Sequence, residues 1–211
     1  KDFYTNQGFS PIAYLRVAKN YITGNGLGGG STISQQLVKN VLLSPERSIQ
    51  RKIKELILSI QVNQKYTKDE ILEMYFNNIP YGGTSIGVQA ASQMYFGKKV
   101  EDLTDAESVF LSGLPQSPSL YSPFSGNKYY LARTKAVLKQ MVADGYITQS
   151  KSDTLYKQIE GFQFSQKYSS IKAPHFVMYV KQKLEEQFGS QMVLSGGLQV
   201  TTTLDYDLEK K

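Results

Sequence analysis

The chain has 211 residues, and its 24 Lys and Arg against 18 Asp and Glu give a net charge of +6 at pH 7 with its one His neutral. Because Cys is absent and His occurs once, the composition excludes a disulfide framework, a thiolate zinc site, a cysteine nucleophile and a multi-histidine metal centre. The hydrophobic fraction of 40% is that of a globular protein with a core. If the chain is an enzyme, its chemistry therefore depends on carboxylates, Lys, Arg and amides.

Helix start signals recur through the first half of the chain. Ser10-Pro11 predicts an N-cap followed by Pro in the first turn, and Thr32-Ile33-Ser34-Gln35 predicts a capping box for a helix ending near residue 43. Ser44-Pro45 predicts the start of a long helix, and Thr67-Lys68-Asp69-Glu70 predicts a second capping box. Five glycines within 23–30 predict a loop, which we interpret as a flexible flap beside a site.

The second half of the chain is also mainly helical in its patterns. A turn is predicted over 80–83, and Thr104-Asp105-Ala106-Glu107 predicts a third capping box. Only 197–204, which is β-branched and alternating, predicts a strand. The expected helices cover 85–96, 105–113, 128–143, 149–158 and 174–188. The patterns thus predict a nearly all-α domain followed by an extended exit.

The glycine loop formally matches nucleotide-binding motifs, but its context argues against them. Gly24, Gly26 and Gly29 have the spacing of a dinucleotide fingerprint, which requires a preceding strand where this sequence predicts a helix. A phosphate-binding P-loop fails as well, because no Lys precedes Ser31-Thr32.

Positive charge is concentrated between residues 39 and 68. This segment carries seven basic side chains against two acidic ones, a local charge of +5. Such a concentration indicates an anionic partner, which could be nucleic acid, a phosphorylated substrate or anionic lipid. The alternative interpretation is a solvated helix face.

The helix after the glycine loop has a polar stripe. Gln36, Lys39 and Asn40 are three to four residues apart and therefore lie on one side of it. The N–H groups that open the helix, at residues 31–33, add partial positive charge that favours an anion. A stripe that simply faces water is the alternative.

The long helix that follows has two contrasting sides. Ile49, Ile53, Leu56 and Ile60 fall within about 60° of one another and predict one apolar side. Arg51 and Glu55 lie opposite, with Arg47 in the same row and Lys52 flanking, so Glu55 is expected on a cationic ridge and not in the core. Either these are surface ion pairs, or the cations keep the carboxylate ionised and bind phosphate themselves.

Five motif segments follow one another in the chain, at 29–40, 51–55, 68–77 with Tyr81-Gly82, 95–98 and 111–118. Together they resemble the signatures of the family 51 peptidoglycan glycosyltransferases. Residues 197–205 are similar to the linker that leads into the transpeptidase domain of class A penicillin-binding proteins. The family's first signature begins with a Glu-Asp pair that would lie just before Lys1, and Asn6 stands where many members have His.

This resemblance implies a fold and an activity. The fold is mainly α, a lysozyme-like helical glycosyltransferase domain over 1–190, with a β-like linker over 191–211 toward a transpeptidase domain outside this chain. The activity is the inverting polymerisation of lipid II into glycan strands for the bacterial cell wall, with undecaprenyl pyrophosphate as the leaving group. The general-base Glu lies before Lys1, so the fragment alone is expected to be inactive.

The resemblance also implies roles for individual residues. Glu55 is the catalytic residue expected within this chain, where it orients the cations or holds Mg²⁺ or Mn²⁺ on the pyrophosphate. No tightly bound cofactor is implied. The substrate-binding residues are expected to be Ser31, Thr32, Gln36, Lys39, Asn40, Arg51 and Lys52.

The implied partners follow from that chemistry. They are lipid II, the lipid-linked glycan strand, the membrane surface and phosphoglycolipid inhibitors such as moenomycin, with no nucleic acid. The expected location is the extracytoplasmic face of the bacterial cell membrane, with an anchor outside this chain. Two alternatives remain open: a non-catalytic basic helical module that binds nucleic acid or anionic lipid, and a muramidase-like hydrolase, which would need a protonated acid.

Overall fold

The structure is a computed structural model in which two compact units pack separately, Lys1–Ser165 and Gln166–Lys211. The domain boundary expected at residue 190 stays a prediction, since these units are defined by packing alone. The structure describes residues 3–13, 15, 19, 23, 29–44, 46, 48–165, 173–189, 192–193 and 197–209.

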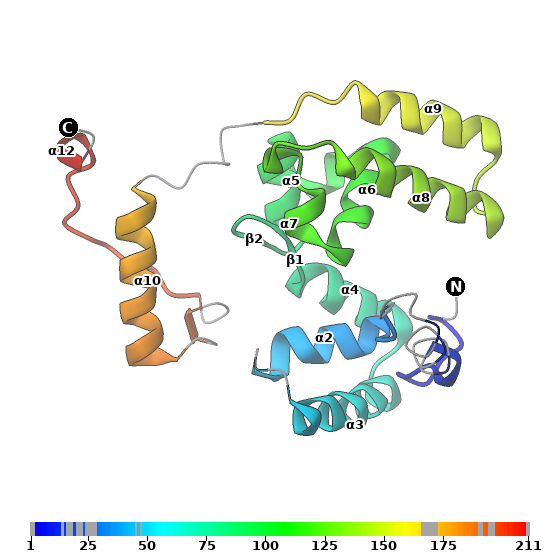
Figure 1. The fold of residues 1–211 in the computed structure, drawn as a ribbon, viewed down its shortest axis with the longest axis horizontal. Coiled ribbons are helices and arrows are strands. Elements are labelled where there is room, and N and C mark those ends of the chain that lie inside the picture. Colours follow the sequence, from blue (N-terminus) through cyan, green and yellow to red (C-terminus); the bar gives the residue numbers. More distant parts are fainter. Residues whose placement is uncertain are drawn as a thin grey trace. The chain divides into compact units, whose positions relative to one another are not determined.

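Three helices form one end of the first unit. Helix α2 (Ile33–Leu42) packs against both α3 (Ile49–Lys65) and α4 (Lys68–Asn78), as Figure 1 shows. The capping boxes predicted at Thr32 and Thr67 are both confirmed, because each side-chain hydroxyl accepts from the N3 backbone N–H. The starts of α2 and α4 are therefore encoded locally.

The start of α3 differs from the prediction. The helix begins at Ile49, and Ser48 is its N-cap, accepting a hydrogen bond from the Arg51 backbone N–H at 3.0 Å. The prediction that Ser44 begins this helix is therefore wrong by about one turn. Two serines compete for the cap, and Ser48 has the hydrogen-bonded geometry.

A short antiparallel hairpin stands where the sequence predicts a turn. Strand β1 (Pro80–Gly82) pairs with β2 (Ser85–Ile86), and helix α5 (Val88–Phe96) then begins three residues later than expected. Gly82 has φ +107°, and a Cβ there would lie 2.8 Å from the Tyr95 hydroxyl. Only glycine combines this backbone angle with this close approach.

The remaining elements of the first unit match the predicted helices closely. Helix α6 begins at the third predicted capping box, where Thr104 and Glu107 cap each other reciprocally. Helices α8 and α9 lie side by side, and α6 packs on both of them. The elements are η1 (Val100–Asp102), α6 (Asp105–Gly113), η2 (Leu114–Gln116), α7 (Pro118–Tyr121), η3 (Pro123–Ser125), α8 (Tyr129–Ala143) and α9 (Gln149–Glu160).

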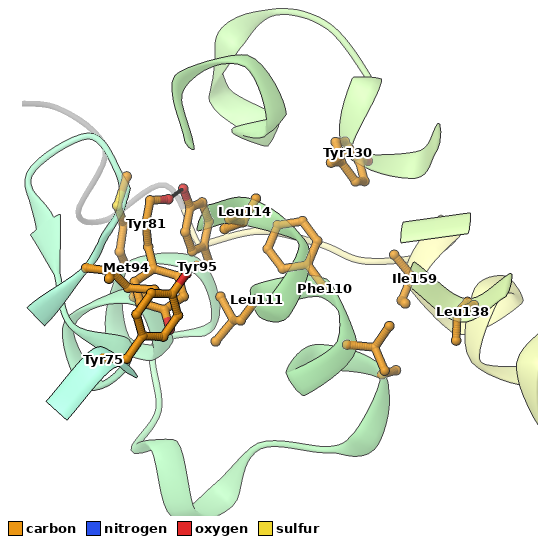
Figure 2. Close-up of a cluster of buried hydrophobic side chains, with 14 of the residues drawn as sticks. Tyr75, Tyr81, Met94, Tyr95, Phe110, Leu111, Leu114, Tyr130, Leu138 and Ile159 are labelled. Carbon is orange, nitrogen blue, oxygen red and sulfur yellow. Dashed lines mark hydrogen bonds between the residues drawn. The ribbon is translucent and has the colours of Figure 1, made fainter. Parts of the chain in front are cut away.

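An aromatic cluster fills the core beneath these helices (Figure 2). The Tyr95 ring lies 5.5 Å from the Phe110 ring in edge-to-face geometry and 5.6 Å from the Phe124 ring in a stacked one. Phe164, from the segment after α9, closes the cluster at 5.0 Å from Phe110. The Tyr95 hydroxyl donates to the Tyr81 carbonyl at 2.7 Å, so this buried polar group is satisfied.

The second unit contains α10 (Pro174–Phe188) and α12 (Tyr206–Glu209). The strand expected over 197–204 is wrong: these residues have no strand assignment, and the one sheet of the described residues is β1–β2. A β-branched segment becomes a strand only where a partner edge supplies hydrogen bonds. With helices throughout the described ranges, the mainly α fold class is confirmed.

Candidate active site

Helix α3 turns its polar side inward. Glu55 is only 2% exposed and Ser59 is fully buried, whereas Ile49, Ile53 and Ile57 are 81%, 54% and 52% exposed. The prediction that Glu55 lies outside the core is therefore wrong, and the apolar side predicted from the spacing faces outward at Ile49 and Ile53. Periodicity defines the two sides of a helix, but the contacts with α2 and α4 decide which side is buried.

Glu55 is held by two cations and a hydroxyl. Lys52 Nζ lies 2.5 Å from Glu55 Oε1, and Arg51 Nη1 lies 3.7 Å from Oε2. Lys52 Nζ also donates to Ser31 Oγ at 2.7 Å, and Ser31 Oγ lies 3.4 Å from Glu55 Oε1 as a donor. We call these four residues the Glu55 cluster. It joins α3 to the segment just before α2.

One donor of the Glu55 cluster is left over. Arg51 Nε is buried and has no hydrogen-bond partner among the described residues. Because buried polar groups are normally paired, this N–H is available to a ligand. The adjacent Lys52 side chain is 40% exposed, so the cluster is open to solvent on that side.

A cavity of about 310 Å³ adjoins the cluster through Ser31. One wall comes from the N-terminal segment and the other from the residues around the start of α2. The lining residues are Phe3, Asn6, Ser10, Ile12, Ala13, Gly29, Gly30, Ser31, Thr32, Ile33 and Gln36. A cavity of this size accommodates a sugar or a phosphate group.

Thr32 and Gln36, two predicted binding residues that line the cavity, already form hydrogen bonds inside the protein. The Thr32 hydroxyl has no donor left for a ligand, because it donates to the Gly8 carbonyl at 2.6 Å and also accepts from the Gln35 backbone N–H. The Gln36 Oε1 accepts from the Tyr75 hydroxyl at 3.2 Å. Burial raises the pKa of Tyr75, so this hydroxyl stays protonated and keeps Gln36 oriented.

Tyr75 was not predicted as a site residue. It lies 39 positions from Gln36 in the sequence, and no local pattern indicates that the two side chains meet. The same holds for Lys68, which donates to the Asn6 carbonyl in the N-terminal wall of the cavity, and for Asn63, which accepts from Lys68.

The basic segment does not act as one patch. The side chains of Lys39 and Asn40 are exposed and form no hydrogen bond or ion pair within the part of the chain that the structure describes, and the cations paired with Glu55 there are Arg51 and Lys52. Lys54 is also exposed. Arg47 and most of the predicted glycine flap lie outside the described residues.

The donor set does not fit a protein-held metal ion. Among the described residues, no three His, Cys, Asp or Glu side chains gather closely enough to bind one. Glu55 Oε1 already accepts from Lys52 and Ser31, and Oε2 lies 3.7 Å from Arg51 Nη1, whereas divalent cations take several oxygen ligands. Mg²⁺ or Mn²⁺ on the pyrophosphate stays a prediction from the resemblance.

Comparison with known proteins decides the family. A family model described as Transglycosylase matches residues 1–142. The chain belongs to the transglycosylase family. Its relatives include penicillin-binding protein 1A of Escherichia coli (strain K12), 38% identical over 96% of this chain and 24% of that protein, and penicillin-binding protein 1A of Aquifex aeolicus (strain VF5), 37% identical over 100% of this chain and 29% of that protein.

The transglycosylase chain spans about a quarter of the length of these relatives. A crystal structure of penicillin-binding protein 1A from Haemophilus influenzae aligns with a TM-score of 0.45 and 28% identity, covering 76% of this chain and 20% of that chain. The transglycosylase family consists of the peptidoglycan glycosyltransferases expected from the sequence motifs.

Proposed function

We propose that this transglycosylase domain polymerises lipid II into glycan strands, with inversion at the donor anomeric carbon and with undecaprenyl pyrophosphate as the leaving group. The observation that carries the proposal is the buried Glu55 cluster opening through Ser31 onto the cavity at the start of α2. A carboxylate with two paired cations beside a sugar-sized cavity suits a reaction that expels a diphosphate.

The two cations act on the leaving group. Negative charge builds up on the pyrophosphate as its bond to the anomeric carbon breaks, and positive groups fixed in advance stabilise that charge most. Arg51 offers its unpaired Nε–H, and Lys52 offers an ammonium that is 40% exposed. Glu55 contacts both side chains and keeps them in place, so it acts through them.

The proposed reaction is chemically balanced and needs no further reactant. A general base removes the proton from the acceptor 4-hydroxyl, and that oxygen attacks the anomeric carbon from the side opposite the pyrophosphate, which leaves with the bonding electrons. Base and leaving group on opposite faces produce inversion. We assign the base to the Glu of the family's first signature, on the grounds of the resemblance.

The remaining predicted residues have graded roles. Ser31 and Gln36 line the cavity with polar atoms and are the candidates for hydrogen bonds to sugar or phosphate. Thr32 holds the cavity wall instead, since its hydroxyl is occupied. Lys39 and Asn40 are exposed on α2 and suit an outer contact with substrate or with a phosphoglycolipid inhibitor such as moenomycin.

We further propose that the isoleucine face of α3, formed by Ile49, Ile53 and Ile57, rests on the membrane surface. These side chains lie at i, i+4 and i+8, and all are more than half exposed. No described helix is long and apolar enough to cross a bilayer. We propose that the full-length protein also carries a membrane anchor and a transpeptidase domain, and that it lies on the extracytoplasmic face of the cell membrane.

The test measures polymerisation of lipid II by the full-length protein carrying Glu55→Gln or Lys52→Met. Each variant is expected to lower kcat by about 10²- to 10³-fold, the size of effect seen when one charge-stabilising group is removed. Lys54→Met is the matched control on the same helix, because Lys54 is exposed and outside the cluster, and it is expected to remain within about twofold. Near-normal synthesis by Glu55→Gln would remove the cluster from the site.

A further inference from the structure

Lys68 occupies a position that helix electrostatics disfavours. It is the first residue of α4, where the helix macrodipole is positive and a cation is destabilising. Burial also lowers the pKa of Lys68, since desolvation opposes its charge. No acidic side chain pairs with Lys68 among the described residues. These costs require an offsetting set of contacts.

Lys68 contacts two residues of the N-terminal segment 3–8 and the side chain of Asn63 on α3. Its Nζ donates to the Asn6 carbonyl at 2.6 Å and to Asn63 Oδ1 at 2.5 Å, and it lies 4.9 Å from the centre of the Phe3 ring. A cation over an aromatic face is attractive, and a charged donor makes the stronger kind of hydrogen bond. Lys68 thus holds two residues of the segment 3–8 at once.

Asn63 connects Lys68 to buried residues of α2 and α3. Its Nδ2 donates to Ser34 Oγ at 2.7 Å and to the Ser59 carbonyl at 2.8 Å, and Ser34 and Ser59 are fully buried. Ser34 belongs to α2, and Asn63 and Ser59 belong to α3. The chain from Lys68 through Asn63 therefore ties the segment 3–8 to three helices.

The far end of the same segment is fixed independently. Thr32 donates to the Gly8 carbonyl, and a Cβ at Gly8, where φ is +96°, would lie 2.4 Å from the Ser59 carbonyl oxygen. The backbone at Gly8 is thus pressed against α3. Phe3 and Asn6 of this segment line the same cavity as Ser31.

We propose that Lys68 is a positioning residue, which holds the segment 3–8 as one wall of the cavity so that the cavity can bind lipid-linked substrate. This inference rests on the proposed function. It assigns Lys68 no contact with the reacting atoms. Loss of Lys68 is therefore expected to weaken substrate binding more than it slows the chemical step.

The test compares Lys68→Met with Lys65→Met in the full-length protein. Lys65 ends α3 and is exposed, and its Nζ lies 5.6 Å from the Tyr66 ring. Among the described residues, no hydrogen bond, ion pair or cation–π contact joins it to the segment 3–8. For Lys68→Met, amide hydrogen exchange in residues 3–8 is expected to rise about tenfold, and KM for lipid II is expected to rise about tenfold with a smaller change in kcat. Lys65→Met is expected to change neither.

Two results would overturn the inference: unchanged exchange in residues 3–8, or faster exchange with an unchanged KM. Thermal unfolding of each variant shows that the protein is folded. If Lys68→Met does not fold, Lys68→Gln replaces it, since glutamine keeps a donor but is too short to reach Asn6 and Asn63 together. A wild-type protein that fails to polymerise lipid II would count against the proposed function, whereas an active wild type with a KM that Lys68→Met leaves unchanged counts against this inference alone.

Discussion

The aromatic core and the α2–α3 pair bury opposite kinds of residue. Around Phe110 the interior consists of aromatic rings and aliphatic side chains, and the buried Tyr95 hydroxyl there has a carbonyl partner (Figure 2). At the α2–α3 contact the buried side chains include Ser34, Gln35 and Glu55, while isoleucines stand in solvent. The first region therefore resembles an ordinary protein interior, whereas the second buries polar side chains and exposes apolar ones.

This difference separates stability from activity within one unit. Apolar burial is the main favourable term in folding, whereas a buried carboxylate with its cations contributes little net stability. A helix that buries Glu55 and exposes Ile49 is therefore poorly explained by folding alone. It is well explained if the polar side receives a diphosphate and the apolar side meets lipid.

The largest expected effect is the loss of a ring from the aromatic core. Phe110→Ala removes a side chain that is 1% exposed and is expected to lower the free energy of unfolding by about 3–5 kcal/mol. Tyr146→Ala is the control, because Tyr146 is 73% exposed. Chemical denaturation measures both variants. A loss below about 1 kcal/mol for Phe110→Ala would contradict the view that this cluster stabilises the fold.

The next effect concerns the isoleucine face. Ile53→Asp is expected to weaken binding of the chain to anionic lipid vesicles by about tenfold or more, through the loss of apolar contact and the added charge. Ile86→Asp on β2 is the matched control, since Ile86 is 44% exposed but lies away from α3. Co-sedimentation measures both. Equal loss in the two variants would show that α3 has no special contact with lipid.

The smallest effect distinguishes two capping boxes of the same geometry. Glu107 is paired with Lys98 at 2.9 Å, whereas Glu70 caps Thr67 without an ion pair among the described residues. Burial opposes ionisation of Glu107, but the bonds from Lys98 and Thr104 outweigh it and hold its pKa below the usual value. Glu107→Gln is expected to cost about 1 kcal/mol of stability, and Glu70→Gln less.

The pH dependence of this difference has a definite sign. A carboxyl with a lowered folded-state pKa stabilises the protein fully above its unfolded-state pKa, about 4.3, and loses that contribution as pH falls through the folded-state pKa. The difference in free energy of unfolding between wild type and Glu107→Gln should therefore shrink as pH falls below the unfolded-state pKa. A gap that widens with acid would contradict the Lys98 pairing. Thermal unfolding between pH 7 and pH 3 measures it.

Local signals predicted the starts of the three helices with capping boxes, but they did not predict which side of α3 is buried. All three capping boxes form because a Thr and a Glu or Gln three residues later need only each other. The outward turn of the isoleucine face could not be predicted, because it depends on α2 and α4, which pack on the opposite side of α3. The short hairpin and the unpaired segment 197–205 likewise depend on whether partners are present.

The candidate site shows the same division. The grouping of Arg51 and Lys52 with Glu55 follows from helical spacing and could be predicted. The contact of Ser31 with that group, the orientation of Gln36 by Tyr75 and the hold of Lys68 on Asn6 join residues 21 to 62 positions apart. Such contacts arise only when the helices pack.

Because α3 carries isoleucines on one side and Glu55 on the other, it works as a spacer. An α-helix with its side chains is about 10–12 Å across, so the ion cluster stands roughly one helix width above any layer on which Ile49 and Ile53 rest. The diphosphate of a lipid-linked substrate could be bound at that height while the hydrocarbon tail stays in the layer below. The thickness of a single helix would then set how far a polymer's attachment point is lifted toward water, without any moving part.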